Sequence, residues 1–487
     1  MPMSVQIFLQ GKILGGEQFL LSTSSEEISV DARAHWIALL TEVLPRALLA
    51  ELGLSKMLLG SSGGEQFLLV LPGEVRAQSE EFLSNAARDI ERISGGLVKL
   101  LWASTENLGD WSIVRKRLNE AMQLKLGTPA ADNFDHIFRP VADSATEHDA
   151  ASALADLGRN LREAQTVGWS PEHAGVVLVD QGKQTWPITN TPDGLPYARH
   201  IALDEDSATR ASTAVLASRA EGRPAWGVLR GDVDNFGARL RKAQSIEEHI
   251  QLSVMFKQFF AGELEVLCSL PEFWRKVTLL YTGGDDFAAY GSWDALISLA
   301  REVQRLFHRF TEEYLKDYTG AEAKTISMAL AVAQGDASLA AVYEEAGKNL
   351  EFAKSSGKDS FWLLGRTLEW KEVSEASDGK DALSRLVRNF GASSQLFYEL
   401  AGFYKDAAQT GGRRLRNPRL ERPWRFHRRL NLVLGNSRNK EFQKLRADLI
   451  ANFAGRNAAH VRLRPAGRVA LEWARLQTEP ATRAQAD

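Results

Sequence analysis

Two short acidic runs decide the fold of this chain. Residues 231–237 read Gly-Asp-Val-Asp-Asn-Phe-Gly, and residues 281–287 read Tyr-Thr-Gly-Gly-Asp-Asp-Phe. An apolar segment precedes each run, at 226–229 and 277–280, and predicts a buried strand. Each strand therefore ends in carboxylates, which are depleted inside strands. Because Gly, Asp and Asn also favour turns, the runs are either structural turns or parts of a metal site for phosphate chemistry.

Composition indicates an ordinary folded protein. The chain has 487 residues, of which 44% are hydrophobic and 25% charged, so we expect roughly two to four domains. The net charge is −3, so any nucleic-acid binding needs a local basic patch. A single cysteine, Cys268, excludes a disulfide framework and a cysteine-rich zinc site and fits a reducing cytoplasm. We find no signal-peptide pattern and no apolar run long enough to span a membrane.

Apolar periodicity predicts the order β-α-β-β-α-β twice, which is a ferredoxin-like unit. The first copy has predicted strands at residues 5–9, on both sides of the glycine turn within 56–72, and at 97–102, with helices over 31–53, 75–94 and 109–125. The second copy has predicted strands at 226–230, 276–281, 287–290, 325–332 and 361–364, with helices within 237–268 and over 293–316 and 338–354.

We therefore predict an α+β protein of four domains. They are a degenerate first ferredoxin-like domain, a small linker domain, a second ferredoxin-like domain with the Gly-Gly-Asp-Asp site, and a C-terminal α-helical domain, at residues 1–127, 128–225, 226–366 and 367–487. The linker contains a polar acidic stretch, a helix, a short strand and a Pro/Gly-rich run, at 132–149, 150–165, 176–179 and 187–196. The C-terminal helices are predicted over 380–407, 440–454 and 469–476.

The two ferredoxin-like domains form a divergent internal repeat. Residues 63–67, Gly-Gly-Glu-Gln-Phe, match residues 283–287 at an offset of 220 (283 − 63). The same offset carries Asp232 to Lys12 and Asp286 to Gln66, so the first copy lacks these carboxylates. The peptide Gly-Gly-Glu-Gln-Phe-Leu-Leu of residues 63–69 also occurs at residues 15–21, too near the N-terminus to be the hairpin, and the sequence does not explain it.

The predicted sheet brings the acidic runs together. In a β-α-β-β-α-β sheet the first strand lies beside the third, so Asp232 should meet Asp285 and Asp286. Such carboxylates suit Mg²⁺ or Mn²⁺, and two ions roughly 4 Å apart would activate a 3′-hydroxyl and stabilise a pyrophosphate leaving group. Gly283 and Gly284 would let a triphosphate approach the backbone closely.

Basic residues later in the chain are candidates for anion binding. Lys354 and Lys358 end a predicted helix and are either phosphate partners or a solvated helix end. Residues 413–429 contain eight arginines interleaved with Trp424, Phe426 and His427. This run is either a solvated basic helix face or a surface for RNA or an acidic partner subunit. The arginines that we select for that contact are Arg413, Arg414, Arg416, Arg425 and Arg428.

The runs at 230–237, 252–260, 281–287 and 350–358 together resemble the second palm domain of the large subunit of type III CRISPR effector complexes. They are more similar to the Csm type than to the Cmr type, and the domain order fits the family. The resemblance implies two nucleotidyl cyclase- or polymerase-like palms. It also implies an RNA-guided antiviral complex in which ATP is converted to cyclic oligoadenylates when target RNA binds. The implied partners are the small subunit, the backbone and cap subunits, guide RNA and target RNA.

The resemblance also implies roles for individual residues. Carried over by motif, Asp232, Asp285 and Asp286 would hold the two metal ions. Ser253 would lie in the adenine pocket and Asn235 near the nucleotide. The 3′-hydroxyl of one ATP would attack the α-phosphate of another, and the first palm would hold the acceptor.

Two departures from the family matter. Family members often begin with a His-Asp nuclease domain, but this chain starts on the first palm, and His148-Asp149 has no partner histidines nearby. We therefore do not expect DNA cleavage. The family's linker often carries a cysteine zinc site, which one cysteine cannot form.

Other functions remain open from the residues. They are a non-catalytic scaffold, a synthase of an AMP conjugate, and a diguanylate-cyclase-like enzyme that makes a cyclic dinucleotide. Three clustered like charges argue against a scaffold. The repeat, the linker and the helical tail disfavour the cyclic-dinucleotide enzyme.

Overall fold

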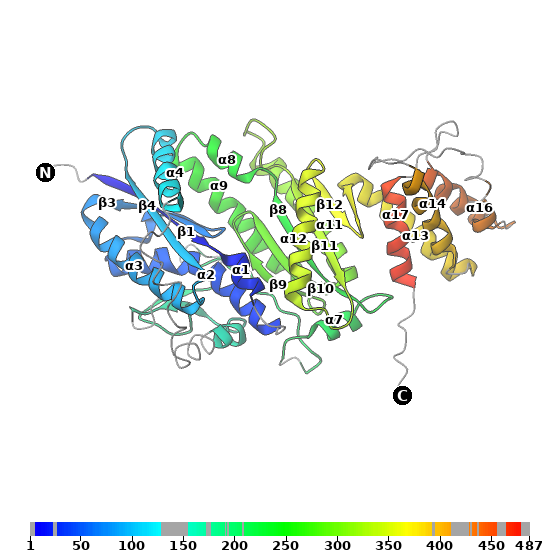
Figure 1. The fold of residues 1–487 in the computed structure, drawn as a ribbon, viewed down its shortest axis with the longest axis horizontal. Helices are drawn as coiled ribbons and strands as arrows, with labels where there is room; N and C mark the ends of the chain where they lie inside the picture. The colour runs from blue at the N-terminus through cyan, green and yellow to red at the C-terminus, as the bar shows by residue number, and fades with distance from the viewer. Residues whose placement is uncertain are drawn as a thin grey trace.

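The computed structural model confirms the α+β class. Figure 1 shows the first sheet, the second sheet and the C-terminal helices following one another along the long axis of the molecule. No helix in the described ranges is long and apolar enough to cross a membrane. The structure describes residues 5–22, 27–127, 154–171, 177–189, 191, 194–206, 209–391, 395–410, 428, 431–435, 438–454 and 464–478.

The first palm is a four-stranded sheet in the order β2-β3-β1-β4. Its strands are β1 (Gln6–Leu14), β2 (Leu59–Gly63), β3 (Gln66–Pro72) and β4 (Lys99–Glu106). Its main helices are α2 (Glu27–Glu51), α3 (Arg76–Ile93) and α4 (Trp111–Gly127). α3 is amphipathic because Leu83, Ala86 and Ile90 fall on one face and are buried. β1 continues five residues beyond the predicted strand because it pairs with both β3 and β4.

The second palm is a six-stranded sheet in the order β13-β12-β11-β8-β10-β9. Its strands are β8 (Trp226–Val233), β9 (Val277–Thr282), β10 (Asp286–Ser292), β11 (Ile326–Ala333), β12 (Ser360–Leu363) and β13 (Arg366–Glu369), the last of which was not predicted. Its helices are α8 (Phe236–Lys242), α9 (Ile246–Gln258), α10 (Leu264–Cys268), α11 (Trp293–Tyr314) and α12 (Leu339–Ser355). A π-helical turn, Phe259–Glu263, joins α9 to α10.

Strand register confirms the internal repeat. The order β2-β3-β1-β4 recurs as β9-β10-β8-β11. Gly11 pairs with Phe67 across β1 and β3, and Gly231 pairs with Phe287 across β8 and β10. A methyl group on Gly11 would lie 2.1 Å from the Phe67 ring, and one on Gly231 would lie 2.3 Å from the Phe287 ring. Each palm therefore packs a phenylalanine ring directly over a glycine of its first strand.

The repeated heptapeptide adopts two different structures. At residues 63–69 it forms the turn between β2 and β3 and the start of β3. At residues 15–21 it forms the short helix α1 (Gly16–Leu21), which begins after Gly15 in the left-handed region. Phe19 of α1 packs against Trp36 of α2, with ring centroids 5.5 Å apart.

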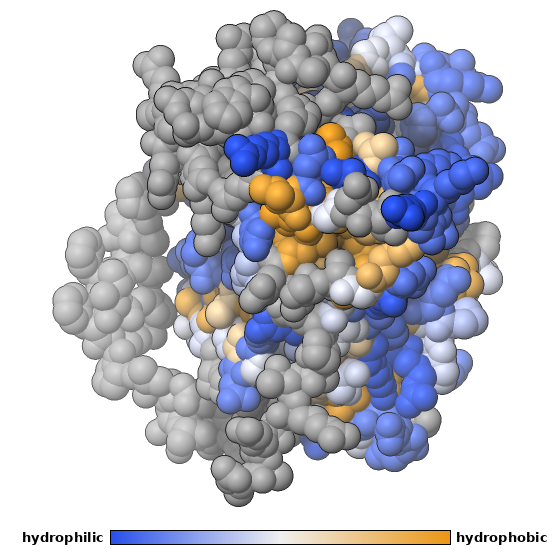
Figure 2. Space-filling view, turned by 90° about the vertical axis from the view of Figure 1, so that its right-hand side faces the viewer, coloured by the Kyte–Doolittle hydropathy of each residue, from blue (hydrophilic) through white to orange (hydrophobic). Residues whose placement is uncertain are grey.

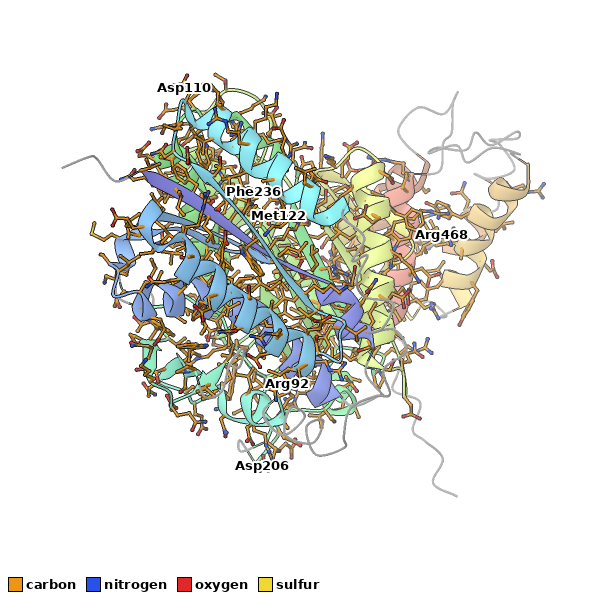
Figure 3. All side chains as sticks on the ribbon, turned by 60° about the vertical axis from the view of Figure 1, so that its left-hand side comes forward. Arg92, Asp110, Met122, Asp206, Phe236 and Arg468 are labelled. Carbon is orange, nitrogen blue, oxygen red and sulfur yellow. The ribbon has the colours of Figure 1, made fainter. Side chains whose placement is uncertain are left out.

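Helix α4 of the first palm contacts the second palm. α4 lies over the first sheet, and Figure 3 shows Asp110 at its start, Met122 near its end and Phe236 of α8 close by. The Arg115 guanidinium donates to the backbone carbonyl of Leu240 at 2.9 Å. Buried residues of α4 pack with Phe8 and Leu68 of the first sheet and with Ala243, the residue after α8.

The linker packs against both palms. It contains a small sheet in the order β6-β5-β7, with β5 (Thr166–Trp169), β6 (Leu178–Val179) and β7 (Gln184–Pro187), and the helix α7 (Thr213–Ser218). Its backbone follows β9, since the Leu279 N–H donates to the His200 carbonyl at 2.9 Å. Trp169 contacts Phe82 of α3, with ring centroids 5.2 Å apart. The predicted acidic stretch and the His148-Asp149 pair lie outside the described residues.

The C-terminal part is helical, as predicted. Its helices are α13 (Trp370–Phe390), α14 (Gln395–Thr410), α16 (Lys440–Ala454) and α17 (Pro465–Thr478). The segment 380–407, predicted to be helical, contains the end of α13 and most of α14, and Gly391 adopts the left-handed conformation that ends α13. Figure 2 views this end of the molecule, where apolar side chains gather near the centre among hydrophilic ones.

We expect Gly11→Ala to lower the free energy of unfolding by about 1–3 kcal/mol, because the new methyl group would overlap the Phe67 ring. Gly127→Ala is the matched control, since a methyl group there meets nothing within 4 Å. Urea denaturation of the two variants measures the difference. Equal stabilities would contradict the packing of Phe67 over Gly11.

Candidate active site

The ladder between β8 and β10 brings the predicted carboxylates together. Asp232 and Asp286 are paired residues of this ladder, as expected when the first strand lies beside the third. Asp285 directly precedes β10, and its carbonyl accepts the Val233 N–H at 2.9 Å. The Gly283 N–H donates to the Asp286 carbonyl at 2.7 Å and closes the turn. The three aspartates therefore lie at one end of the second sheet.

The two Gly-Gly turns of the chain face each other. A methyl group on Gly64 would lie 3.6 Å from the Asp285 carboxylate and 3.6 Å from the Gly284 nitrogen. A methyl group on Gly63 would lie 3.8 Å from the same Gly284 nitrogen. The acidic turn of the second palm is thus adjacent to its degenerate counterpart, and the site lies on the boundary between the palms.

A cavity of ≈ 270 Å³ lies on this boundary and takes residues from both palms. Its acidic side chains outnumber its basic ones, so the cavity favours cations or a ligand that brings cations with it. The acids are Glu17, Glu42, Glu65, Asp232, Asp285 and Asp286, and the bases are Arg230 and Lys257. The rest of the wall is mostly apolar or aromatic and includes Leu20, Ala34, Ile37, Ala38, Tyr197, Tyr281 and Tyr343, together with Thr41 and Thr282.

Burial and mutual repulsion raise the pKa values of these carboxyls. Burial, with the charges of Asp286 and Asp232, raises the pKa of Asp285 to about 8. Burial raises the pKa of Asp232 to about 6, although Lys354 opposes the shift. Burial also raises the pKa of Asp286, although the Tyr281 hydroxyl donates to its carboxylate at 3.0 Å. In the first palm, burial and Asp286 raise the pKa of Glu65 to about 6. A divalent cation would relieve this repulsion.

The carboxylates fit a magnesium ion whose remaining ligands would come from water and a bound nucleotide. Within the described residues, no three His, Cys, Asp or Glu side chains form a ready-made metal site. Instead, Lys354 Nζ lies 3.0 Å from Asp232 Oδ2. Mg²⁺ usually binds through one or two carboxylates with water and substrate phosphates rather than in an all-protein cage. Asp232 and Asp286 provide two such carboxylates on adjacent strands, and the three-carboxylate assignment stays a prediction.

The structure separates the predicted nucleotide-binding residues. Lys354 lies beside Asp232 at the end of α12 and is therefore part of the site. The Lys358 ammonium donates to the side-chain oxygen of Asn235, the residue directly before α8. Ser253 lies half-buried on α9 and does not line the cavity, whereas Lys257, one turn later, does. The adenine-pocket role of Ser253 stays a prediction.

Asp234, the second acid of the 231–237 run, is structural. Its side chain is buried and accepts hydrogen bonds from Thr325 Oγ1 at 2.8 Å, Ser327 Oγ at 2.8 Å and the Asp359 N–H at 2.9 Å. These bonds tie the end of β8 to β11 and to the residues before β12. The Gly-Asp-Val-Asp motif thus supplies one carboxylate to the cavity and one to the sheet.

Sequence reasoning missed several residues of the cavity. Arg230 lies 4.2 Å over the Tyr343 ring and donates to Glu17 Oε1 at 3.1 Å. Its strand alternation with Asp232 places both side chains on one face of β8, a signal that could have revealed it. Glu17 and Glu42 lie on helices of the other palm, and no local pattern marks them.

The predicted arginine contact surface lies almost entirely outside the described residues. Of the five selected arginines, the structure describes Arg428 alone, and its side chain is exposed. Binding of RNA or a partner subunit by this run stays a prediction.

Fold and site together define a two-palm protein with one acidic and one degenerate Gly-Gly turn. Residues 225–362 match the family described as Cas10/Cmr2, second palm domain. The matched segment contains Asp232, Asp285 and Asp286 together with β8 to β11 and most of β12. The second palm is therefore similar to the Cas10/Cmr2 second palm domain over nearly its full length.

Curated relatives match about a third of the chain. The single-strand-specific deoxyribonuclease Cas10/Csm1 (subtype III-A) of Mycobacterium tuberculosis is 28% identical over 177 residues, which cover 32% of this chain and 21% of that protein. The protein of the same description from Thermococcus onnurineus is 26% identical over 183 residues, covering 35% and 22%. The matches thus span about a fifth of these relatives' length.

Solved structures share the fold over nearly the whole chain. The apo Csm1-Csm4 cassette superposes with a TM-score of 0.75 at 17% identity, covering 98% of this chain and 70% of the other. The cassette in complex with cA4 gives a TM-score of 0.73 at 16% identity with the same coverage. At these identities the likeness establishes the fold. The family match and the descriptions of the curated relatives agree with the similarity to the Csm type that the motifs predicted.

We expect Asp285→Asn to stabilise the protein in metal-free buffer at pH 8 by at least about 1 kcal/mol. A carboxyl with a higher pKa in the folded than in the unfolded chain binds more protons when folded. The stability of the wild type therefore falls as the pH rises from about 4, the unfolded value, to about 8. Asn at position 285 does not titrate and removes this loss of stability. The extra stability of Asp285→Asn over the wild type should therefore vanish near pH 4.

Thermal unfolding across this pH range, with and without Mg²⁺, measures the effect. Asp317→Asn is the control, because Asp317 is exposed on the second palm. A stabilisation by Asp285→Asn that is the same at pH 4.5 and pH 8 would show that the pKa of Asp285 is not raised.

Proposed function

We propose that this chain is the large subunit of a type III RNA-guided complex and transfers AMP from ATP to make cyclic oligoadenylates. The observation that carries the proposal is the acidic Gly-Gly turn of the second palm, with Asp232 and Asp286 in register, on the boundary with the degenerate first palm. The Cas10/Cmr2 palm match over residues 225–362 supports it. So do the fold neighbours, whose descriptions include ATP and cA4.

Asp232 and Asp286, with Asp285 beside them, would hold Mg²⁺ or Mn²⁺. When bound, such ions neutralise the triphosphate and lower the pKa of an attacking hydroxyl. The backbone at Gly284, where a methyl group would meet nothing closer than 3.8 Å, would leave room for the phosphates. Lys354 pairs with Asp232 here and would turn to a phosphate oxygen when the nucleotide enters, because its ammonium is within reach of the same point.

The two palms would have different roles. The second palm holds the donor ATP, and the first palm holds the acceptor, whose 3′-oxygen attacks the donor α-phosphorus. A new P–O bond forms, the bond to the β-phosphate oxygen breaks, and pyrophosphate leaves. The hydroxyl proton passes to a carboxylate of the cluster. Lys12 and Gln66, the counterparts of Asp232 and Asp286, would leave the first palm without metals of its own.

The remaining assignments follow from the same proposal. The proposed domain boundaries are those predicted from the sequence, with domains at residues 1–127, 128–225, 226–366 and 367–487. The partners are the small subunit, the backbone and cap subunits, guide RNA and target RNA. Csm1 is described with Csm4 in the fold neighbours, which supports a partner of that kind for this chain.

We expect Asp232→Ala and the double variant D285A/D286A to lower product formation from ATP by at least about 100-fold, because charge stabilisation at the transferred phosphate is lost. The assay is mass spectrometry of the products that the assembled complex forms from ATP, Mn²⁺ and target RNA. Asp317→Ala, an exposed acid of the second palm, is the control and should retain activity.

Two results would contradict the proposal. One is an unchanged product yield in D285A/D286A, which would remove the site. The other is a higher yield from GTP than from ATP, which would favour a cyclic-dinucleotide synthase.

A further inference from the structure

The palms are joined beside the cavity by a buried ion pair. Lys257, in the last turn of α9, extends from the second palm to the first, where its ammonium lies 2.5 Å from Glu42 Oε2 on α2. The side chains are 12% and 4% exposed, respectively. Both residues also line the cavity that contains the aspartates. The pair therefore crosses the boundary between the palms where nucleotides are proposed to meet.

The same carboxylate also holds the first Gly-Gly turn. Ser62 Oγ donates to Glu42 Oε2 at 2.9 Å, and the Lys257 ammonium donates to Ser62 Oγ at 3.1 Å. Ser62 directly precedes Gly63 and Gly64, which face Gly284 and Asp285. A short chain of contacts thus runs from Lys257 through Glu42 and Ser62 to the acidic turn.

Further contacts hold the Glu42 side chain in place. Arg46, one helical turn later on α2, lies 2.8 Å from the same carboxylate oxygen. The attraction of Lys257 and Arg46 outweighs the burial of Glu42, so the pKa of Glu42 falls and its carboxylate is charged. A buried charge that loses its partner is strongly unfavourable, and the hydrogen bond between Lys257 and Glu42 depends on distance and angle. The Lys257–Glu42 pair therefore selects one spacing of the palms, which apolar packing alone would define less sharply.

The second ion pair between the palms is weaker. Arg230 donates to Glu17, but the Glu17 side chain is 61% exposed, and water and salt screen such a pair. Of these two pairs lining the cavity, the Lys257–Glu42 pair is the one that can set the geometry.

We propose that the Lys257–Glu42 ion pair is a clamp that fixes the spacing of the two palms and thereby aligns the acceptor and donor nucleotides at the facing Gly-Gly turns. Its effect on alignment rests on the proposed nucleotidyl transfer, whereas its effect on spacing does not. Lys257 is a positioning residue in this proposal, since it acts through Glu42 and Ser62.

The spacing can be measured without nucleotide. Spin labels at Glu80→Cys on α3 and Arg309→Cys on α11 report the distance between the palms in the full chain, because both positions are exposed and the native Cys268 is buried. We expect K257M and E42Q each to shift or broaden the distance distribution. K183M is the matched control, because Lys183 binds Glu51 of the same helix α2 at 2.7 Å but belongs to the linker. It should leave the distribution unchanged.

Kinetics then separate alignment from binding. In the assembled complex, we expect K257M and E42Q each to lower kcat at least about tenfold and to change the KM for ATP less than about threefold, because misalignment raises the barrier without removing a ligand contact. K257R should restore part of kcat. The double variant K257M/E42Q should be no worse than either single variant, since both act on one interaction. It also leaves no Glu42 charge to bury if K257M alone does not fold.

Three results would overturn the clamp. The first is an unchanged distance distribution in both single variants and in the double variant. The second is a rise in KM in K257M alone, with E42Q unaffected, which would make Lys257 a direct nucleotide ligand. The third is additive loss in the double variant. If the wild type transferred no nucleotide at all, the proposed function would fail, yet the distance measurement would still decide the clamp.

Discussion

The structure depends on the register of β8 against β10. This register places Asp232 opposite Asp286 and Gly231 opposite Phe287. Because successive side chains of a strand point to opposite faces, a slip of one residue would turn the carboxylates into the apolar core and expel the phenylalanine. The Phe287 ring, which covers Gly231, opposes such a slip. Burial of one aromatic ring therefore holds three repelling carboxylates at one end of the sheet.

The duplicated fold distributes charge unequally between its halves. The first palm has Lys12 opposite Gln66 where the second has Asp232 opposite Asp286. At the boundary between the palms, however, the first palm provides acids, Glu17 and Glu42, and the second provides bases, Arg230 and Lys257. The two palms thus differ in the site, where only the second has the candidate metal-binding carboxylates, and are complementary in charge at their boundary.

Much of this arrangement follows from patterns within the chain. Strand periodicity, the two acidic runs and the offset of 220 residues predicted two sheets, the pairing of the first strand with the third, and the meeting of Asp232 with Asp285 and Asp286. Local patterns did not predict that Asp234 serves the sheet, because both aspartates of the run look alike. Nor did they predict Lys257, Glu42 and Glu17, because these side chains meet only when two separately patterned units pack together.

The repeated heptapeptide shows where sequence alone is insufficient. The sequence by itself determined the α+β class, the duplication and the acidic turn, since each depends on local periodicity and turn chemistry. The same seven residues form a helix at 15–21 and a hairpin at 63–69. Their local preferences are identical, so burial decides. Phe19, in the helical copy, packs against Trp36 of α2. Phe67, in the strand copy, covers Gly11 of the neighbouring strand. Only the tertiary structure decided these two conformations, and with them the position of both Gly-Gly turns at one cavity.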